Sequence, residues 1–343
     1  MSQTASTEPD KYSMRSAQEQ LSQSSWQQAM ADAYTRPADL LQDLGLDPLT
    51  RDAAVTAFAM RVPRSYAARM AHGDPHDPLL LQVLPGRGEL LAAPGFTADP
   101  VGDLNSIRAP GLLQKYAGRA LIITTGACAV HCRYCFRRDF PYGEQLAGRK
   151  RLAALMERLR EDESITEVIL SGGDPLSLTD DRLHELLQGL DQLPQLRRVR
   201  IHTRTPIVLP ERVNNSLIEV LQQLRKPLVT VLHCNHANEI DGQVSRAISL
   251  LKQCSASVLN QTVLLKDIND SAPALVNLSE KLFTAGVLPY YLHQLDPVAG
   301  AAHFAVSDTR ARACLRAAAA RLPGYLVPRL VREQAGAAAK SPL

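Results

Sequence analysis

Short apolar, β-leaning segments alternate with helix-like segments over most of this 343-residue chain. Runs typical of buried strands occur at 120–124, 167–170, 199–202, 228–232, 258–263 and 288–292. Stretches with helical spacing of apolar residues occur between them, at 152–160, 181–190, 213–224, 244–253 and 273–285. A strand followed by a helix, repeated about six times, predicts an α/β fold of parallel strands joined by helical crossovers. Periodicity does not distinguish a barrel from an open sheet, but both place ligands at the carboxyl ends of the strands.

The part of the chain before these repeats has a different character. Residues 1–24 are rich in Ser and Gln, and we expect them to be disordered. Residues 26–71 carry apolar residues at helical spacing, Leu40 and Leu44 among them, which predicts an N-terminal helical extension. The stretch 73–110 is rich in Pro, Gly and Asp, and we expect a long connection that covers the core.

Composition and charge argue against several classes of protein. The net charge of +3 is small for the length, and no dense Lys/Arg run is present, so nucleic acid is not an expected partner. No apolar stretch reaches the roughly 18 residues that a membrane span needs, so no membrane association is expected. The first residues lack the apolar core of a signal peptide, which favours a cytoplasmic location. In a reducing cytoplasm the six cysteines are thiols or ligands rather than disulfides.

Three of the six cysteines lie within eight residues, directly after the first predicted strand. Cys128, Cys132 and Cys135 are spaced as C-x3-C-x2-C. Three thiolates on one tight loop can hold three corners of a cubane iron–sulfur cluster and leave the fourth iron open. A structural zinc site is the alternative, but it needs a fourth ligand, which His131 would have to supply in poor tetrahedral geometry. We interpret Cys234, Cys254 and Cys314 as ordinary core residues.

The cysteine loop resembles the signature of the radical S-adenosylmethionine (SAM) superfamily. This resemblance implies a partial (β/α)6 barrel whose open iron binds the amino and carboxylate groups of SAM. It also implies a [4Fe–4S] cluster and release of a 5′-deoxyadenosyl radical after electron transfer. An electron donor such as a flavodoxin or ferredoxin is then an expected partner.

Longer stretches resemble the lysine 2,3-aminomutase family, whose members also use pyridoxal 5′-phosphate (PLP) bound to a lysine. Seven segments carry this resemblance, at 77–85, 115–138, 167–176, 233–240, 259–270, 294–304 and 324–343. Composition, spacing and the resemblance together predict four regions: a disordered polar tail, a helical region with a covering segment, a radical SAM barrel and a C-terminal segment with the PLP lysine. We expect these regions at 1–24, 25–110, 111–330 and 331–343.

The resemblance implies cofactor-binding positions in this sequence. Lys340 matches the catalytic lysine that holds PLP, and Tyr116 and Arg119 match positions near the PLP phosphate. Six further positions are expected at the cofactors, with the turn 171–174 at the methionyl part of SAM: Tyr134, Ser171, Gly172, Gly173, Asp174 and Gln261. Read alone, the turn could be an ordinary βα turn, Arg119 could cap the preceding turn, and Lys340 could be a solvated terminal residue. The loop before Lys340 is Ala-rich where the family has Gly, so it could run differently or even helically.

The resemblance also implies a substrate site for L-lysine. Arg137 matches the arginine that binds the substrate carboxylate, and Asp296 and Glu333 match the two acids that hold the ε-ammonium group. An acidic pair selects a cationic side chain, although Glu333 stands where the family's lysine enzymes generally have Asp. We therefore expect an isomerase that converts L-α-lysine to β-lysine. An aminomutase for another amino acid and a cluster-binding protein without this activity are the alternatives.

Within the family, the chain resembles a short bacterial form. The product of that form, β-lysine, is attached by a separate ligase to a lysine of translation elongation factor P. This resemblance adds elongation factor P and its lysyl ligase as expected functional partners.

Overall fold

A curved, mostly parallel sheet organises the part of the chain that this computed structural model describes, namely residues 26–47, 56–145 and 149–343. The ten strands follow one another in chain order across the sheet. Their bounds are β1 Ile107–Ala109, β2 Leu112–Tyr116, β3 Arg119–Thr125, β4 Glu167–Gly172, β5 Arg198–Thr203, β6 Leu228–His233, β7 Ser257–Val263, β8 Leu288–His293, β9 Arg329–Arg332 and β10 Ser341–Pro342. The strands from β3 to β9 are parallel, and β1, β2 and β10 pair antiparallel at the two edges.

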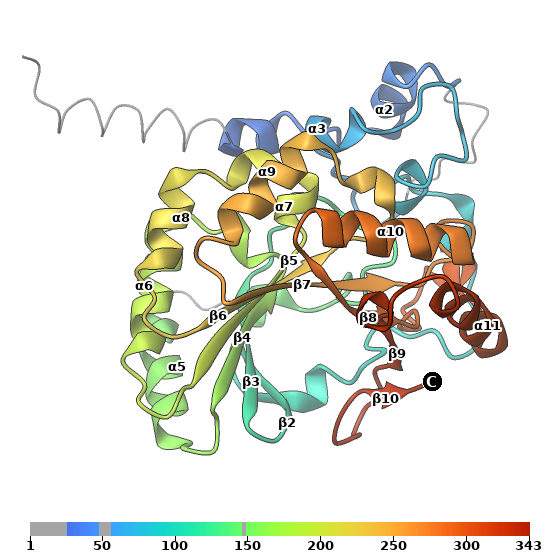
Figure 1. The fold of residues 1–343 in the computed structure, drawn as a ribbon. Helices are drawn as coiled ribbons and strands as arrows, with labels where there is room; N and C mark the ends of the chain where they lie inside the picture. Colours follow the sequence, from blue (N-terminus) through green and yellow to red (C-terminus); the bar gives the residue numbers. More distant parts are fainter. Residues whose placement is uncertain (1–25, 48–55, 146–148) are drawn as a thin grey trace, which may run out of the picture.

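Helices connect the parallel strands and cover the outer face of the sheet (Figure 1). Their bounds are α2 Pro37–Asp43, α3 Arg64–Ala67, α4 Tyr142–Gln145, α5 Arg149–Glu161, α6 Asp180–Asp191, α7 Thr205–Val208, α8 Asn215–Gln222, α9 Gly242–Leu251, α10 Ala272–Thr284 and α11 Asp308–Ala319. Short 3₁₀ helices occupy Leu80–Gln82, Arg87–Leu90, Leu104–Ser106, Pro175–Ser177, Pro210–Arg212, Ala237–Glu239, Ala302–Phe304 and Gly324–Leu326. Within the described ranges, no helix is both long enough and apolar enough to cross a membrane.

Side-chain caps fix where several of the crossover helices begin. Asn214, Asp241, Ser271 and Ser307 each accept a hydrogen bond from a backbone N–H in the first turn of α8, α9, α10 and α11, respectively. Such a cap satisfies a backbone donor that has no partner inside the helix, and stabilises it by about 1 kcal/mol. The sequence therefore fixes these helix starts locally.

The main core lies between the sheet and these helices. Val168 of β4 and Val199 of β5 are fully buried there against Leu183 and Leu187 of α6. A fully buried Val or Leu side chain stabilises the fold by about 1.5–3 kcal/mol. Because side chains alternate along a strand, the neighbours of these valines lie on the opposite, concave face. On β5 the residues of that face include His202, so the inside of the barrel is partly polar.

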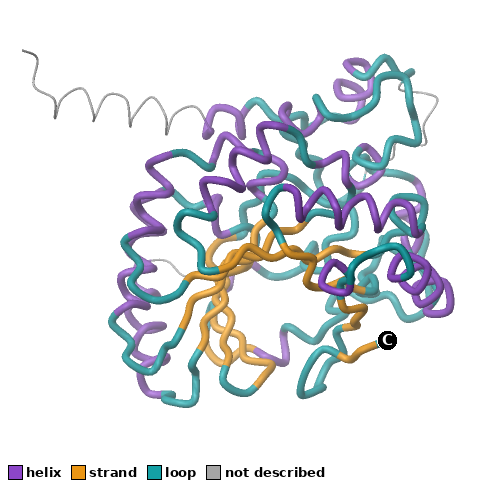
Figure 2. The backbone as a smooth tube through the Cα atoms, viewed as in Figure 1, coloured by secondary structure: helices purple, strands orange, loops and turns teal. Residues whose placement is uncertain are grey.

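The predicted radical SAM fold class is confirmed, with extra strands at both edges. All six predicted strands and all five predicted crossover helices are present, and β8, α11 and β9 add a further βα repeat. The edge strand β10 and the strand β2, which is next to the other edge strand β1, lie on opposite sides of the opening of the barrel (Figures 1 and 2). The Tyr116 hydroxyl donates to Glu333 Oε1 at 2.6 Å, so side chains bridge β2 to the segment between β9 and β10.

The region before the barrel is less helical than its apolar spacing predicts. Residues 26–31, α2 and α3 are helical, and the rest of the described part consists of turns, 3₁₀ helices and the strand β1. Pro37 opens α2 and Pro63 directly precedes α3, which limits helix length because proline cannot donate the i→i−4 hydrogen bond. The predicted disorder of 1–24 lies outside the described residues.

Candidate active site

The three predicted cluster ligands lie on one loop that follows β3 at the carboxyl edge of the sheet. Cys128, Cys132 and Cys135 are free thiols and are each partly exposed. Burial, with a smaller effect from Cys132, raises the pKa of the Cys135 thiol to about 11. Burial also raises the pKa of Cys128, followed by the charges of Asp174 and of the other two thiols. The thiols of this loop therefore raise the pKa values of Cys128 and Cys135.

The covering segment and its neighbours hold this loop in place. The backbone N–H of His131 donates to the carbonyl of Arg61, and that of Arg133 donates to the carbonyl of Gln82, both at 2.9 Å. The Arg133 side chain is fully buried and pairs with Glu89 at 2.5 Å between Nη2 and Oε2. Because a buried ion pair is costly to break, the loop is tied firmly to the N-terminal region.

The His131 imidazole, which a zinc site would need as its fourth ligand, has other partners. The His131 ring stacks on Phe58 at 5.3 Å between centroids, and its Nδ1 lies 2.9 Å from the carbonyl oxygen of Ala59. Among the described residues, no three His, Cys, Asp or Glu side chains converge closely enough to hold a single ion. A cubane cluster instead takes its thiolates at separate corners. The remaining thiols pack against the apolar cores, as expected: Cys234, Cys254 and Cys314.

The glycines at the end of β4, Gly172 and Gly173, are packed against the end of β3 and the start of the cysteine loop. A Cβ at Gly173 would lie 2.3 Å from the carbonyl oxygen of Ala127, and one at Gly172 would lie 2.7 Å from that of Thr125. The N–H groups of Gly173 and Asp174 donate to these same two carbonyls at 2.6 and 2.8 Å. Gly172 also has φ = +122°, a conformation that favours glycine. The turn therefore shapes the loop that carries the thiols.

Replacing Gly173 should disturb the cysteine loop more than the stability of the domain. We expect Gly173→Ala protein to take up clearly less iron than wild type on anaerobic reconstitution, since overpacking costs about 1–3 kcal/mol and the loop can relieve it by moving. Iron and sulfide per chain measure this. Gly143→Ala is the matched control because no atom lies within 4 Å of a Cβ there. Equal iron content in both variants would contradict this reading of the turn.

Asp174 closes the turn with a set of internal hydrogen bonds. Its carboxylate accepts from the backbone N–H of Leu176, Arg204 and Thr205 and from the Thr203 hydroxyl, at 2.7–3.0 Å. Burial raises the pKa of Asp174, while these donors act in the opposite direction. The carboxylate thereby joins the end of β4 to the end of β5, next to the cysteine loop.

A chain of charged side chains runs from the cysteine loop to the C-terminal lysine. Arg137 Nε lies 2.6 Å from Asp103 Oδ2, and Asp103 Oδ1 lies 2.6 Å from Lys115 Nζ. Lys115 is 3.8 Å from Glu333 Oε1, and Lys340 Nζ is 2.6 Å from Glu333 Oε2. Although burial alone would raise it, Arg137 and Lys115 hold the pKa of Asp103 below its usual value. The predicted PLP lysine and two predicted substrate residues thus belong to one network.

The other predicted PLP contacts lie beside this network. The cation of Arg119 lies 4.9 Å from the ring centroid of Tyr116, on the hairpin of β2 and β3. Burial and Glu333 together raise the pKa of Tyr116. Lys340 Nζ lies 5.7 Å from the ring centroid of Tyr291. The Ala-rich segment before Lys340 is a turn with Gly336 at φ = +78°, not a helix.

Asp296 is a partly buried acid with one fully buried carboxylate oxygen. Among the described residues, no group donates to its buried Oδ1. Burial raises the pKa of Asp296 to about 7, with a smaller opposite effect from Lys340. An unpaired buried carboxylate costs free energy unless a donor or cation reaches it. Asp296 therefore fits an ammonium group next to Glu333, which supports the family's substrate at this place.

Three imidazoles that the sequence analysis did not single out lie inside the barrel, on β5, β6 and β8. The rings of His202 and His233 are 5.9 Å apart, and His233 Nε2 lies 2.6 Å from the Nε2 atom of Gln261. Burial lowers the pKa of His233 to about 3 and also lowers those of His202 and His293. All three are neutral, so the interior beside Lys340 gains no positive charge from them. The sequence indicates their orientation only through the alternation of side chains along each strand, which turns every second residue toward the inside of the barrel.

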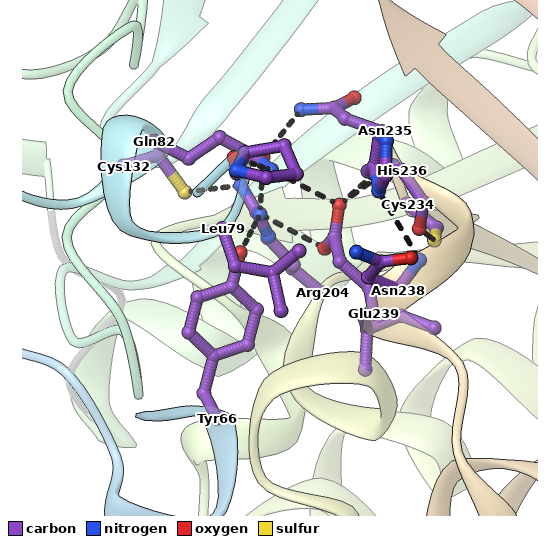
Figure 3. Close-up of polar contacts among 12 residues, drawn as sticks. Tyr66, Leu79, Gln82, Cys132, Arg204, Cys234, Asn235, His236, Asn238 and Glu239 are labelled. Carbon is purple, nitrogen blue, oxygen red and sulfur yellow. Dashed lines mark hydrogen bonds and ion pairs between the residues drawn. The ribbon is translucent and has the colours of Figure 1, made fainter. Parts of the chain in front are cut away.

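The predicted cofactor residue Tyr134 contacts the buried polar cluster that Figure 3 shows around Arg204. Asn235 Nδ2 donates to the Tyr134 hydroxyl at 2.6 Å and to Gln82 Oε1 at 3.0 Å. Arg204 pairs with Glu239 at 3.0 Å between Nη2 and Oε2. The stretches 77–85 and 233–240 contain Gln82, Asn235 and Glu239, but no local pattern assigns them a role.

Comparisons with known proteins identify the relatives of this chain. The family model described as Radical SAM superfamily matches residues 122–236. L-lysine 2,3-aminomutase from Escherichia coli (strain K12) is 46% identical over 94% of this chain and 95% of that protein. The Haemophilus influenzae protein of the same name is 42% identical over 91% and 93%. That of Clostridium subterminale is 31% identical over 86% and 73%.

Among solved structures, a radical SAM methyltransferase from Sphaerobacter thermophilus aligns with a TM-score of 0.46 at 20% identity. That alignment covers 64% of this chain and 68% of the other. The nearly full-length identity to the bacterial aminomutases is much higher. The chain belongs to the L-lysine 2,3-aminomutase family of radical SAM enzymes.

Proposed function

We propose that this protein converts L-α-lysine to β-lysine with a [4Fe–4S] cluster, SAM and PLP as cofactors. The observation that carries the proposal is the pairing of Glu333 with Lys340 near Asp296, whose buried Oδ1 accepts no hydrogen bond among the described residues. These groups give one site an amine for PLP and two acids for the substrate's ammonium group. The aminomutase family membership of the chain supports the same reaction.

The cofactors carry the hard chemistry: the cluster with SAM supplies an adenosyl radical, and PLP supplies a carrier for the migrating amino group. We propose that Cys128, Cys132 and Cys135 hold the cluster. The turn 171–174 shapes the cysteine loop and is proposed to border SAM, together with Tyr134 and Gln261. Lys340 is proposed as the residue that binds PLP covalently.

The remaining residues orient the substrate. We propose that Arg137 binds the lysine carboxylate, since a guanidinium forms two parallel hydrogen bonds with such a group. Asp103 and the Ser171 hydroxyl already fix the Arg137 side chain, at 2.6 and 3.0 Å. Glu333 and Asp296 are proposed to hold the ε-ammonium group, and Tyr116 and Arg119 to lie near the PLP phosphate. A substrate held at both ends keeps its reacting carbons fixed.

An anaerobic assay with a panel of amino acids tests the proposed substrate. Reconstituted protein receives SAM, PLP and dithionite with L-lysine, L-arginine, L-ornithine or L-glutamate, and mass spectrometry quantifies the β-amino acids. We expect β-lysine from lysine and little product from glutamate, because two carboxylates repel an acidic side chain. A higher rate with arginine or ornithine would assign the enzyme to another substrate. Protein that carries an intact cluster but forms no product would favour the cluster-binding alternative.

The raised pKa of Asp296 predicts that lysine binding depends on pH. With a pKa of about 7, the carboxyl is mostly neutral at lower pH and cannot pair with the ammonium group, which stays charged throughout. Between about pH 6 and pH 8 the ionised fraction rises, so the KM for lysine should fall by up to roughly tenfold. Asp296→Asn protein should have a higher KM that no longer changes in this range. If the KM of this variant still fell with pH as it does in wild-type protein, Asp296 would be excluded as the titrating group.

The proposed setting is a reducing cytoplasm, where a low-potential donor such as a flavodoxin or ferredoxin supplies electrons. The six free thiols support this setting. We propose that a ligase attaches the product to elongation factor P, on the resemblance to the short bacterial form. Mass spectrometry of elongation factor P, incubated with its ligase and the β-lysine formed here, tests this proposal. Unmodified elongation factor P would exclude this destination.

A further inference from the structure

One buried arginine touches a proposed cluster ligand directly. Arg204 follows β5 and is only 7% exposed. Its Nη1 donates to Cys132 Sγ at 2.8 Å (Figure 3). The same Nη1 also contacts the Tyr134 hydroxyl. Nη2 donates to Gln82 Oε1 at 2.8 Å and to Glu239 Oε2 at 3.0 Å. The guanidinium is thus shared between a carboxylate and a sulfur atom.

Several groups prevent Arg204 from turning away from the sulfur. Its backbone N–H donates to Asp174 Oδ2 at 2.7 Å, which fixes the chain at this point. Glu239 is fully buried, and its Oε1 accepts from the backbone N–H of Asn235 and of His236 at 2.8 and 2.9 Å. The carboxylate is therefore a rigid partner, and a buried charge rarely leaves such a partner. Arg204 keeps its position without any contact from the substrate.

We propose that Arg204 sets the reduction potential of the cluster through its hydrogen bond to Cys132. Reducing the cluster from the 2+ to the 1+ state adds one electron from a low-potential donor and makes the cysteine sulfur atoms more negative. Hydrogen bonds to these sulfurs and nearby positive charge stabilise the reduced state more than the oxidised one. Arg204 supplies both, so it raises the potential. This inference rests on the proposed role of Cys132 as a cluster ligand.

Glu239 has the opposite effect on the same cluster. It binds the other edge of the guanidinium and partly neutralises it, and it brings a negative charge of its own. Because charges interact strongly in a poorly solvated site, both effects disfavour the reduced cluster. Arg204 and Glu239 therefore form a pair whose members shift the potential in opposite directions. A residue that only maintains the fold would not produce this opposition in sign.

The test is an anaerobic potentiometric titration of reconstituted protein with dithionite, followed by the electron paramagnetic resonance signal of the reduced cluster. At the wild-type midpoint, Arg204→Gln should lower the ratio of reduced to oxidised cluster by about tenfold, equivalent to 59 mV for one electron. Glu239→Gln should raise that ratio. Arg204→Lys keeps the charge, so its midpoint potential should lie between those of wild type and Arg204→Gln. If Arg204→Gln binds no cluster, the midpoint of Arg204→Lys provides the test instead.

Arg212 offers a matched control. It is fully buried, pairs with Asp180 at 2.7 Å and donates to the carbonyl of Leu176. Within the described residues, these contacts do not include the cysteine loop. Arg212→Lys should leave the midpoint unchanged. An unchanged midpoint in the Arg204 variants, or shifts of the same sign for the Arg204 and Glu239 variants, would overturn the proposal. Arg204 variants that bind SAM more weakly but keep the wild-type midpoint would also overturn it. If wild-type protein holds no [4Fe–4S] cluster, the proposed function itself fails.

Discussion

Cys132→Ser protein should form neither β-lysine nor 5′-deoxyadenosine above background, a loss of at least about three orders of magnitude in rate, because the cofactor that three thiolates hold carries the chemistry. Serine is nearly the same size but is a poor ligand for iron. The variant also removes the sulfur acceptor of the Arg204 hydrogen bond. We expect loss of the visible absorption of the cluster together with loss of both products, measured on anaerobically reconstituted protein.

Cys314→Ser provides the control for this experiment. Cys314 packs against the separate apolar cluster under α11 and donates to the carbonyl of Asp270 at 3.1 Å, an interaction that a serine hydroxyl can replace. We expect near wild-type iron content and activity. Wild-type turnover in the Cys132 variant would refute the cluster assignment, and equal losses in both variants would indicate a general effect on folding.

Lys340→Ala protein should lose covalently bound PLP and at least about a thousandfold in activity, because its side chain would no longer form the covalent bond to the cofactor. Its iron content should stay normal, since Lys340 lies in the C-terminal segment and pairs with Glu333, away from the thiols. The measurement is peptide mapping after borohydride reduction, which fixes PLP to the lysine that holds it. In wild-type protein the label should lie on the peptide that contains Lys340.

The matched control is Lys281→Ala, on the exposed face of α10. It should retain PLP and activity, because its side chain is exposed and none of the proposed cofactor residues belongs to α10. Stable labelling of a lysine other than Lys340 in wild-type protein would contradict the proposed role of Lys340. In that case, the Ala-rich turn before Lys340, where the family has glycines, would mark a change in the residue that binds PLP.

The sequence predicts those parts of the fold that depend on local patterns. The strands β3, β4 and β6 were predictable because runs of Val, Ile and Leu suit buried parallel strands, and β5, β7 and β8 because shorter β-leaning segments recur between helix-like stretches. The strand β9, Arg329–Arg332, was not, since its two apolar residues stand between arginines and its pairing with β8 is set by distant residues. The helix α11 was not predicted, because its sequence is rich in Ala and Arg and has no face of large apolar residues. Its cap residue, Ser307, was the one local indication of a helix start.

The site shows the same division between local and distant information. The three cysteines lie within eight residues, so their position on one loop follows from sequence alone. The contact between Arg204 and Cys132 joins positions 72 residues apart, and no periodicity reports it. Gly173 was expected beside a ligand because glycine allows close approach, but the atom that excludes a Cβ there is the carbonyl oxygen of Ala127. The sequence thus indicates that a glycine is required without indicating its neighbour.

The most direct test of the central claim uses L-lysine carrying deuterium on its β-carbon. Anaerobic protein with cluster, SAM, PLP and dithionite is allowed to turn over, and the recovered 5′-deoxyadenosine and β-lysine are analysed by mass spectrometry. We expect deuterium in the 5′-deoxyadenosine and its return to β-lysine at C2, since the hydrogen taken from the substrate must pass through the adenosyl group. Deoxyadenosine without deuterium, from protein with an intact cluster, would contradict it.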